Sequence, residues 1–294
     1  MIPRPINDAL RAVGARIRKR DPELYVKLRD LRRHWTVRNE GLATYQELSL
    51  AWFREHADLR GARILELGGD PRQVVADALM MAGAAEVTSI NQDPSLFDTA
   101  GPLRSPAGAR LMKGDAAALP FANESVDLVV SVAVYEHLLD LPTVLTETWR
   151  VLQPGGVQVA FFGPIWSSGR GHHVSVAVDD VEYRHFLPRR NPIPDHGHLL
   201  LGEAEMRHGL LHGGLPEAHV EAMVGYIYRG DAINRLFLDD YRAMVEASGF
   251  IRPTWRYDRD PMASAVEELL TLRHPTRRDF DVTNAYVAMS KEKA

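Results

Sequence analysis

The stretch Arg-Ile-Leu-Glu-Leu-Gly-Gly-Asp, residues 63–70, constrains the fold of this chain more than any other. Arg63–Leu67 is a short apolar run that ends beside a carboxylate, which predicts a strand. Gly68 and Gly69 allow the backbone to turn tightly, and the apolar-rich run Val74–Ala85 behind them has helical spacing. A strand, a glycine turn and a helix form the first half of a βαβ unit, in which ligands bind at the carboxyl ends of the strands.

The turn carries two acids, Glu66 and Asp70, and these indicate the charge of the ligand. A loop that binds a dinucleotide presents bare N–H groups and a helix N-terminus to a pyrophosphate. Two carboxylates beside two phosphates would repel each other, by about 1 kcal/mol or more for each close pair. We therefore expect a ligand with cationic groups at this turn.

The composition narrows the class of protein. With 294 residues, of which 45% are hydrophobic and 25% charged, the chain can bury a large α/β core. A formal net charge of -4 without a long basic run argues against nucleic acid as the main partner. The absence of cysteine excludes disulfides, thiolate catalysis and zinc sites built on thiolates. The N-terminus lacks the apolar run of a signal peptide, and no stretch of about twenty apolar residues could span a membrane, so we expect a cytoplasmic protein without a membrane partner.

Further motifs follow the glycine turn in a fixed order. Met112–Phe121 reads Met-Lys-Gly-Asp-Ala-Ala-Ala-Leu-Pro-Phe and leads into the apolar strand Ser125–Ser131. A helix-like run starts at Tyr135-Glu136-His137 and leads into Arg150–Gly156, Arg-Val-Leu-Gln-Pro-Gly-Gly. Together with the acid and the glycines of the first turn, this set resembles the signature of the class I S-adenosylmethionine-dependent methyltransferases, in the broad group that includes the ubiquinone- and sterol-methylating enzymes. The cofactor of that family carries an ammonium and a sulfonium.

The resemblance implies a set of cofactor-binding residues. It places Glu66 with the two glycines on the methionine part of S-adenosylmethionine and Asn91 on the ribose. It also implies that Asp115 accepts a hydrogen bond from the adenine amino group and that the Ala116 backbone binds the adenine ring. The full set of cofactor-binding candidates is Glu66, Gly68, Gly69, Asn91, Gln92, Asp115, Ala116 and Ser131.

The implied fold is a doubly wound, Rossmann-like α/β sheet of seven strands with N-terminal helices and a cap inserted after the fifth strand. We expect an N-terminal helical layer over residues 1–60, a cofactor-binding core over 61–163, a substrate cap over 164–235 and the remaining helix and last two strands over 236–294. The N-terminal helices either pack on the sheet or form a lid that brings Tyr45 or Trp35 to the substrate pocket. Glu136 and His137, at the end of the fourth strand, either brace the adjoining loop or contact the substrate.

The expected cap is rich in histidine, with eight of the twelve histidines of the chain. One interpretation makes His172 or His173 a general base, because they closely follow the end of the fifth strand and an imidazole pKa near 6.5 suits proton transfer. A second interpretation is a metal site, since His208 and His212 have i, i+4 spacing and a His-x-His pair follows Asp195, but no specific ligand spacing is present. A third is that the histidines are structural. We predict His172 and His173 as catalytic candidates and no metal.

These patterns predict methyl transfer from S-adenosylmethionine to a hydroxyl, less readily to an amine, of a small polar molecule such as a sugar or secondary metabolite. The expected partner is that small-molecule acceptor, and the protein is a candidate homodimer. The alternative is a methyltransferase-fold protein that does not methylate and serves as a binding partner or catalyses another reaction. Asp70 and Arg72 stand where the family usually has glycine, and Asn91 stands where it usually has an acid, which favours that alternative. A dinucleotide enzyme is a third interpretation, against which the acids of the turn argue.

Overall fold

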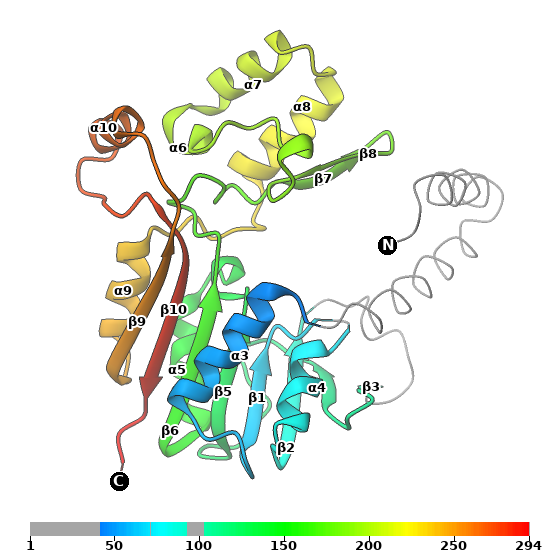
Figure 1. Ribbon diagram of the computed structural model, residues 1–294, viewed down its shortest axis with the longest axis vertical. Coiled ribbons are helices and arrows are strands. Elements are labelled where there is room, and N and C mark those ends of the chain that lie inside the picture. Colours follow the sequence, from blue (N-terminus) through cyan, green and yellow to red (C-terminus); the bar gives the residue numbers. More distant parts are fainter. Residues whose placement is uncertain (1–41, 71, 93–102, 294) are drawn as a thin grey trace, which may run out of the picture. The chain divides into compact units, whose positions relative to one another are not determined.

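An eight-stranded sheet lies at the centre of the fold (Figure 1). The computed structural model describes residues 42–70, 72–92 and 103–293. The chain divides into two units, residues 1–47 and 48–294, and the sheet belongs to the second. The strand order is β3-β4-β2-β1-β5-β6-β10-β9. The strands are β1 (Arg63–Leu67), β2 (Glu86–Asn91), β3 (Leu103–Arg104), β4 (Arg110–Lys113), β5 (Val126–Val132), β6 (Leu152–Phe162), β9 (Ile251–Arg259) and β10 (Val282–Ser290).

The sheet has the mostly parallel, doubly wound topology that the sequence predicts. Strands β4, β2, β1, β5 and β6 are parallel, and β10 runs antiparallel between β6 and β9. Seven strands match the expected ones, and the eighth is the two-residue β3, which pairs antiparallel with β4 at the sheet edge. So short a strand carries no periodicity that a sequence pattern can reveal. β6 also takes in most of the predicted Arg150–Gly156 motif, because Leu152 already pairs with Val126 ahead of a register shift.

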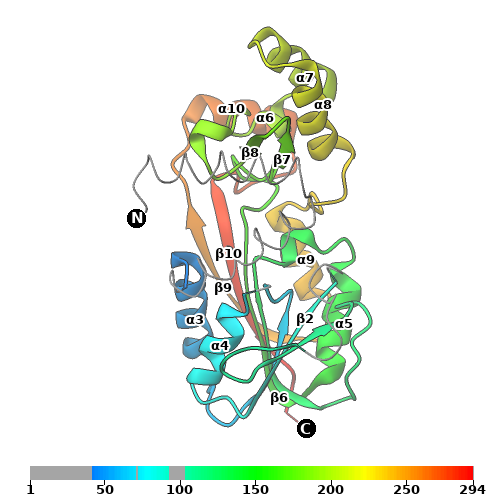
Figure 2. The same ribbon diagram turned by 90° about the vertical axis from the view of Figure 1, so that its right-hand side faces the viewer.

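Helices cover both faces of the sheet (Figure 2). α3 (Thr44–His56, of which residues 48–56 lie in the second unit) and α4 (Val74–Met81) lie on one face, and α5 (Leu141–Val151) and α9 (Leu238–Glu246) lie on the other. α4 ends at Met81 instead of running to Ala85, because Gly83 adopts a φ of 98° and turns the chain toward β2. The main core packs α5 and α9 against the central strands, and fully burying each large apolar side chain there contributes about 1.5–3 kcal/mol.

The segment after β6 forms a separately cored cap. Its core includes Trp166, Leu210 and Met223, and it also takes in Leu270 and Phe280, which come from the segment between β9 and β10. The cap is therefore built from two stretches of chain, and α10 (Ser264–Arg273) packs beside α6. The other cap elements are β7 (Ser175–Val178), β8 (Val181–Arg184), η3 (Pro188–Arg190), α6 (Gly197–Leu200), α7 (Glu203–His212), α8 (Glu217–Val224) and the π-helical η4 (Gly225–Arg229).

The predicted N-terminal layer is only partly covered by the structure. Residues 1–41, with Trp35, lie outside the described residues, so the lid interpretation stays a prediction. Tyr45 belongs to α3 and is 40% exposed. Among the described residues, every helix is too short or too polar to cross a bilayer.

Candidate cofactor and acceptor site

Glu66, at the carboxyl end of β1, is the best defined polar group of the site. Its side chain is buried, with 3% of the residue exposed, and the Ser89 hydroxyl donates a hydrogen bond of 2.6 Å to its Oε2. The two residues stand side by side because β1 and β2 pair Glu66 with Ser89 in register. Burial raises the pKa of Glu66 to about 7, although the bond from Ser89 opposes the shift. A cationic ligand group at this strand end would favour the ionised carboxylate.

The glycine turn after Glu66 is sterically required. Gly68 has a φ of 70°, and a Cβ there would overlap the side chain of Val134. A Cβ on Gly69 would overlap the Ser89 hydroxyl, the group that bonds Glu66. The N–H groups of both glycines donate to the Ile90 carbonyl, at 2.8 and 3.2 Å. Because these two donors are already used within the protein, the turn lacks the bare N–H pair of a pyrophosphate cradle.

The remaining predicted cofactor residues follow neighbouring strands at the same edge. Asn91, at the end of β2, donates from Nδ2 to the Gly69 carbonyl at 2.8 Å, so the residue assigned to the ribose also fastens the turn. Gln92 is exposed and is the last described residue before the gap at 93–102. The Gly114 N–H donates to the Asn91 carbonyl at 3.1 Å, which brings the loop after β4 beside β2.

Asp115 lies in that loop and forms a local turn. Its Oδ1 accepts from the Ala117 N–H at 2.9 Å, and its carbonyl accepts from the Ala118 N–H at 3.0 Å. Asp115 is exposed and Ala116 is buried. Ser131, near the end of β5, is 1% exposed, and its hydroxyl has no hydrogen-bond partner among the described residues. The predicted cofactor residues thus share one sheet edge, where those of β1 and β2 contact one another directly.

The short helix η2 (Tyr135–His137) follows β5 and joins the sheet to the cap. Glu136 is fully buried, and its Oε1 accepts from the Gly163 N–H at 3.0 Å. Its carbonyl accepts from the Asn234 N–H at 2.9 Å, where the chain returns from the cap. Burial raises the pKa of Glu136. These contacts are those of a brace between the ends of β5, β6 and the cap, which is one of the two roles expected for Glu136.

The two catalytic candidates differ in the nitrogen lone pairs that they leave for proton transfer. His172 Nδ1 accepts from the Val174 N–H at 3.1 Å, so in the neutral ring the proton sits on Nε2. His173 is held the other way round, because its Nε2 lies 2.5 Å from the Pro164 carbonyl and must carry the proton to donate to it. The lone pair on His173 Nδ1 is therefore left for a further partner. By this hydrogen-bond assignment, His173 is the better proton acceptor of the two.

Five histidine rings make a continuous series at the base of the cap. Ring centroids are 5.2 Å apart for His137 and His173, 4.7 Å for His173 and His185, and 5.4 Å for His172 and His198, while 6.4 Å separates His185 from His172. Burial is the main cause that lowers the pKa of the four inner rings, to about 2 for His172, 3 for His173, 4 for His185 and 3 for His198. These four imidazoles are neutral at pH 7.

The spacing-based metal interpretation finds no ligand set in the part of the chain that the structure describes. No three histidine, aspartate or glutamate side chains converge there on one point. His208 and His212 are both exposed on α7, with ring centroids 6.3 Å apart. The Nε2 of His196 lies 2.9 Å from the Phe280 carbonyl, to which it donates, so this ring links the two segments of the cap.

Residues 66–160 match the sequence model of a family described as a methyltransferase domain. An uncharacterized methyltransferase of Mycobacterium marinum is 31% identical over 139 residues, which are 45% of this chain and 54% of that protein. A 2-methyl-6-phytyl-1,4-hydroquinone methyltransferase of rice is 29% identical over 136 residues, 45% of this chain and 35% of that protein. The chain spans about half the length of the mycobacterial relatives that it matches.

Residues 66–160 thus match a methyltransferase domain, in agreement with the class I S-adenosylmethionine-dependent family that the sequence motifs predict. S-adenosylmethionine is the cofactor of this class, so the predicted family and cofactor are confirmed. Among solved structures, the [4+2]-cyclase SpnF matches with a TM-score of 0.50 at 13% identity, covering 87% of this chain and 85% of that one. This likeness shows the fold alone.

Two residues that shape the site carry no signal in the sequence. Ser89 lies in the middle of β2, and only the register with β1 shows that its hydroxyl bonds Glu66. Val134 has an apolar side chain without a reactive group, yet it packs so close to position 68 that only glycine fits there. The cap adds His185 and His198, whose Nδ1 atoms are buried without a hydrogen-bond partner among the described residues. His198 belongs to the His-x-His pair that the sequence suggested as a metal ligand, and no local pattern marks His185, because the contacts that define both rings cross the fold.

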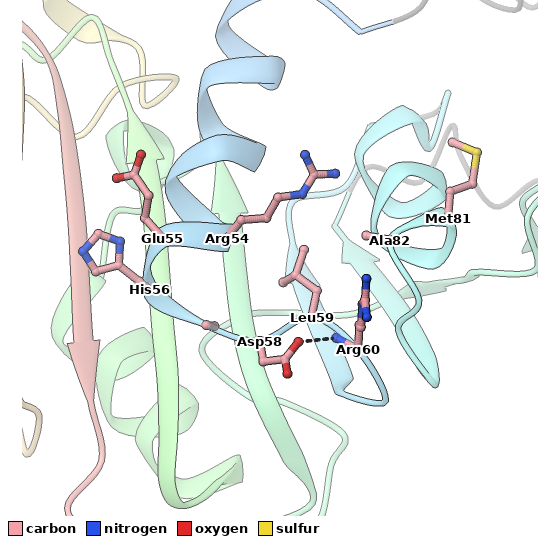
Figure 3. A pocket seen from close by; sticks show the side chains of 9 residues that line it. Arg54, Glu55, His56, Asp58, Leu59, Arg60, Met81 and Ala82 are labelled. Atoms are coloured by element: carbon pink, nitrogen blue, oxygen red, sulfur yellow. Dashed lines mark hydrogen bonds between the residues drawn. The ribbon is translucent and has the colours of Figure 1, made fainter.

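A large hollow among the described residues lies away from this site (Figure 3). It has a volume of about 770 Å³ and is lined by the ends of α3 and α4 and the loop that leads into β1. In Figure 3, Asp58 accepts a hydrogen bond from the Arg60 N–H at 3.0 Å. Because this loop precedes β1, the hollow is at the amino ends of the strands, opposite to the edge that carries Glu66. Cofactors of doubly wound sheets bind at the carboxyl ends, so we do not assign the hollow to the cofactor.

Proposed function

We propose that this protein transfers a methyl group from S-adenosylmethionine to a hydroxyl group of a small polar acceptor. The observation that carries the proposal is that the buried Glu66 and its glycine turn stand at the start of the segment that matches the methyltransferase domain. The turn fits the cofactor chemically, because a buried carboxylate suits a cationic group and a Cβ at either glycine would fill the turn. The internal use of both glycine N–H groups argues against a dinucleotide.

The residues that would hold the cofactor lie along one sheet edge. Glu66 would attract the ammonium group, Asn91 would hydrogen-bond the ribose, and Asp115 would accept from the adenine amino group. When bound, the cofactor supplies a methyl group on a sulfonium. The protein's own contribution is to position the acceptor in line with that methyl group and to exclude water.

His173 is our choice for the general base. The bond from its Nε2–H to the Pro164 carbonyl fixes the ring and leaves the Nδ1 lone pair to take the acceptor's proton. Burial lowers the pKa of His173 to about 3, so the ring is neutral and able to accept a proton at pH 7, but it is a weaker base than the imidazole of pKa near 6.5 that the sequence led us to expect. General base catalysis of this kind contributes about a hundredfold or more. His172, whose Nδ1 accepts from the Val174 N–H, serves in this proposal to hold the loop.

A second candidate function is a different reaction in the same fold. Its support is that the structurally similar SpnF is a [4+2]-cyclase, and that Asp70 and Arg72 replace the usual glycines of the turn. Asp70 Oδ1 accepts from the Arg72 backbone N–H at 2.6 Å and lies 3.7 Å from Arg72 Nε, so both side chains have a part in shaping the turn. A fold alone does not fix the reaction. Cofactor binding followed by methyl transfer decides between the two candidates.

Calorimetric titration with S-adenosylmethionine and S-adenosylhomocysteine is the first test. We expect dissociation constants in the micromolar range for the wild-type protein. Asp115→Ala should weaken binding about ten- to a hundredfold, since it removes a hydrogen bond to a charged group worth about 1.5–3 kcal/mol. Asp58→Ala, an exposed aspartate at the opposite sheet edge, is the matched control and should bind normally. Equal affinity of Asp115→Ala and wild type would remove the adenine assignment, and no binding to the folded wild type would refute the proposed function.

The acceptor is then sought with the labelled cofactor. The protein is incubated with S-adenosylmethionine carrying a radioactive methyl group and with separate small phenols, hydroquinones, sugars and amines. Label recovered in a methyl ether of a hydroxyl compound supports O-methylation, whereas label on a ring carbon contradicts it. Label only in the amines would contradict the oxygen preference and leave the methyltransferase proposal standing.

A further inference from the structure

His137 and His173 form a pair with opposite surroundings. His137 ends η2 and is exposed, whereas His173 is 5% exposed. Their ring centroids are 5.2 Å apart and their planes are perpendicular, so the edge of one ring meets the face of the other. A buried imidazole and a solvent-exposed imidazole are thus direct neighbours, although 35 residues of sequence separate them.

Each ring has one nitrogen fixed by a backbone carbonyl. The Nδ1 of His137 lies 2.5 Å from the Ala232 carbonyl, so Nδ1 carries the proton and Nε2 carries the lone pair. His173 donates from Nε2 to the Pro164 carbonyl, so its lone pair is on Nδ1. In the neutral state, both rings therefore hold an unprotonated nitrogen that can take up and release a proton without breaking its bond to the backbone.

A buried base needs an exit for the proton that it removes. Its neighbours on the inner side, His172, His185 and His198, are imidazoles held neutral by burial, and none offers a negative charge. His185 is nearer to His173, with 4.7 Å between centroids, but its Nδ1 is sealed from solvent. His185 is only half-buried, whereas His137 is exposed, so His137 offers the more open route from His173 to bulk water.

We propose that His137 carries the proton from His173 to solvent after each methyl transfer. This rests on the proposed function and on His173 as its base. The acceptor oxygen forms a bond to the methyl carbon while the electrons of the carbon–sulfur bond return to sulfur, and the hydroxyl proton moves to His173 Nδ1. That proton then passes to His137 Nε2 through one water molecule and leaves to bulk water. Both rings return to their starting neutral states, so the step balances without another reactant.

The first test needs no acceptor. In protein labelled with ¹⁵N-histidine, NMR measures how fast the proton on His173 Nε2 exchanges with water. Exchange without opening of the fold requires a second proton to reach Nδ1 before the first one leaves, and His137 provides that route. His137→Asn keeps a donor at the δ position for the Ala232 carbonyl but removes the Nε2 lone pair. We expect exchange at least fivefold slower in this variant, an order-of-magnitude expectation for loss of a proton-transfer group.

A bracing role of His137 predicts the opposite sign, because loosening η2 would speed exchange. Unchanged or faster exchange in His137→Asn therefore overturns the proposal. His208→Asn, on the exposed surface of α7, is the matched control and should exchange like the wild type.

The second test uses the hydroxyl acceptor found with the labelled cofactor. His137→Asn should lower kcat about tenfold with KM unchanged, and added imidazole should restore the rate by taking over proton removal. A loss of rate that imidazole does not restore counts against the relay. If the wild-type protein binds no S-adenosylmethionine, the proposed function fails, while the NMR measurement still decides whether protons pass through His137.

Discussion

Mild acid should destabilise this protein through its buried histidines. His172, His173, His185 and His198 have pKa values lowered to about 2, 3, 4 and 3, whereas an unfolded histidine titrates near 6.5. Below pH 6.5 the unfolded chain therefore binds more protons than the folded one. The stability contributed by these neutral rings is complete above pH 6.5 and is lost progressively as the pH falls toward the folded-state pKa values.

The magnitude follows from proton linkage. Between pH 7 and pH 5.5 each neutral buried ring loses about 1.2 kcal/mol relative to its unfolded state, and the four together lose about 5 kcal/mol. Glu66 acts in the opposite direction, because its pKa is raised to about 7 and its protonation stabilises the fold as the pH falls. Protonation of that carboxyl raises the free energy of unfolding by about 1.6 kcal/mol over the same interval. The net expected loss is about 3 kcal/mol, a large part of the 5–15 kcal/mol that typically stabilises a domain.

Urea denaturation followed by circular dichroism at the two pH values measures this loss. A matched pair of variants isolates the histidine contribution. His185→Gln removes one of the four rings and should reduce the pH dependence by about 1.2 kcal/mol. His208→Gln, an exposed histidine, should leave it unchanged. Equal stability at pH 7 and pH 5.5, or equal pH dependence in the two variants, would refute the reasoning.

Two further predictions concern the turn and the base. Gly69→Ala should lower the free energy of unfolding by about 1–3 kcal/mol, because its Cβ would overlap the Ser89 hydroxyl. The double variant Gly69→Ala with Ser89→Gly should recover part of that loss in urea denaturation. If the losses of the two single variants simply add in the double variant, the two side chains do not clash. With the identified acceptor, His173→Gln should lower kcat about a hundredfold while His172→Gln changes it much less, since the lone pair on His172 Nδ1 is already used. Steady-state kinetics with circular dichroism as the folding control distinguishes them, and equal loss in the two variants would contradict the choice of His173.

Local patterns in the sequence predict most of the sheet. Arg63–Leu67 forms β1 with the predicted bounds, and Val282–Ser290 forms β10, because alternation and apolar runs are properties of a few consecutive residues. The glycines after β1 also predict a tight turn, and Gly68 adopts the positive φ that such a turn requires. By contrast, β3 is too short to leave a pattern, and the end of α4 depends on where Gly83 turns the chain.

The sequence by itself predicted seven strands of the sheet and a cationic ligand at the end of β1, because these depend on residue types at short spacing, and the resemblance of its motifs to a known family supplied the class of cofactor. Only the tertiary structure decided which side chains work together. Ser89 meets Glu66 through strand register, and Leu270 joins the cap core from a distant segment. The contrast between His172 and His173 arises from which backbone group meets each ring. Adjacent residues of the same type are equivalent in a sequence, and their protonation and chemistry diverge only when the fold supplies different partners.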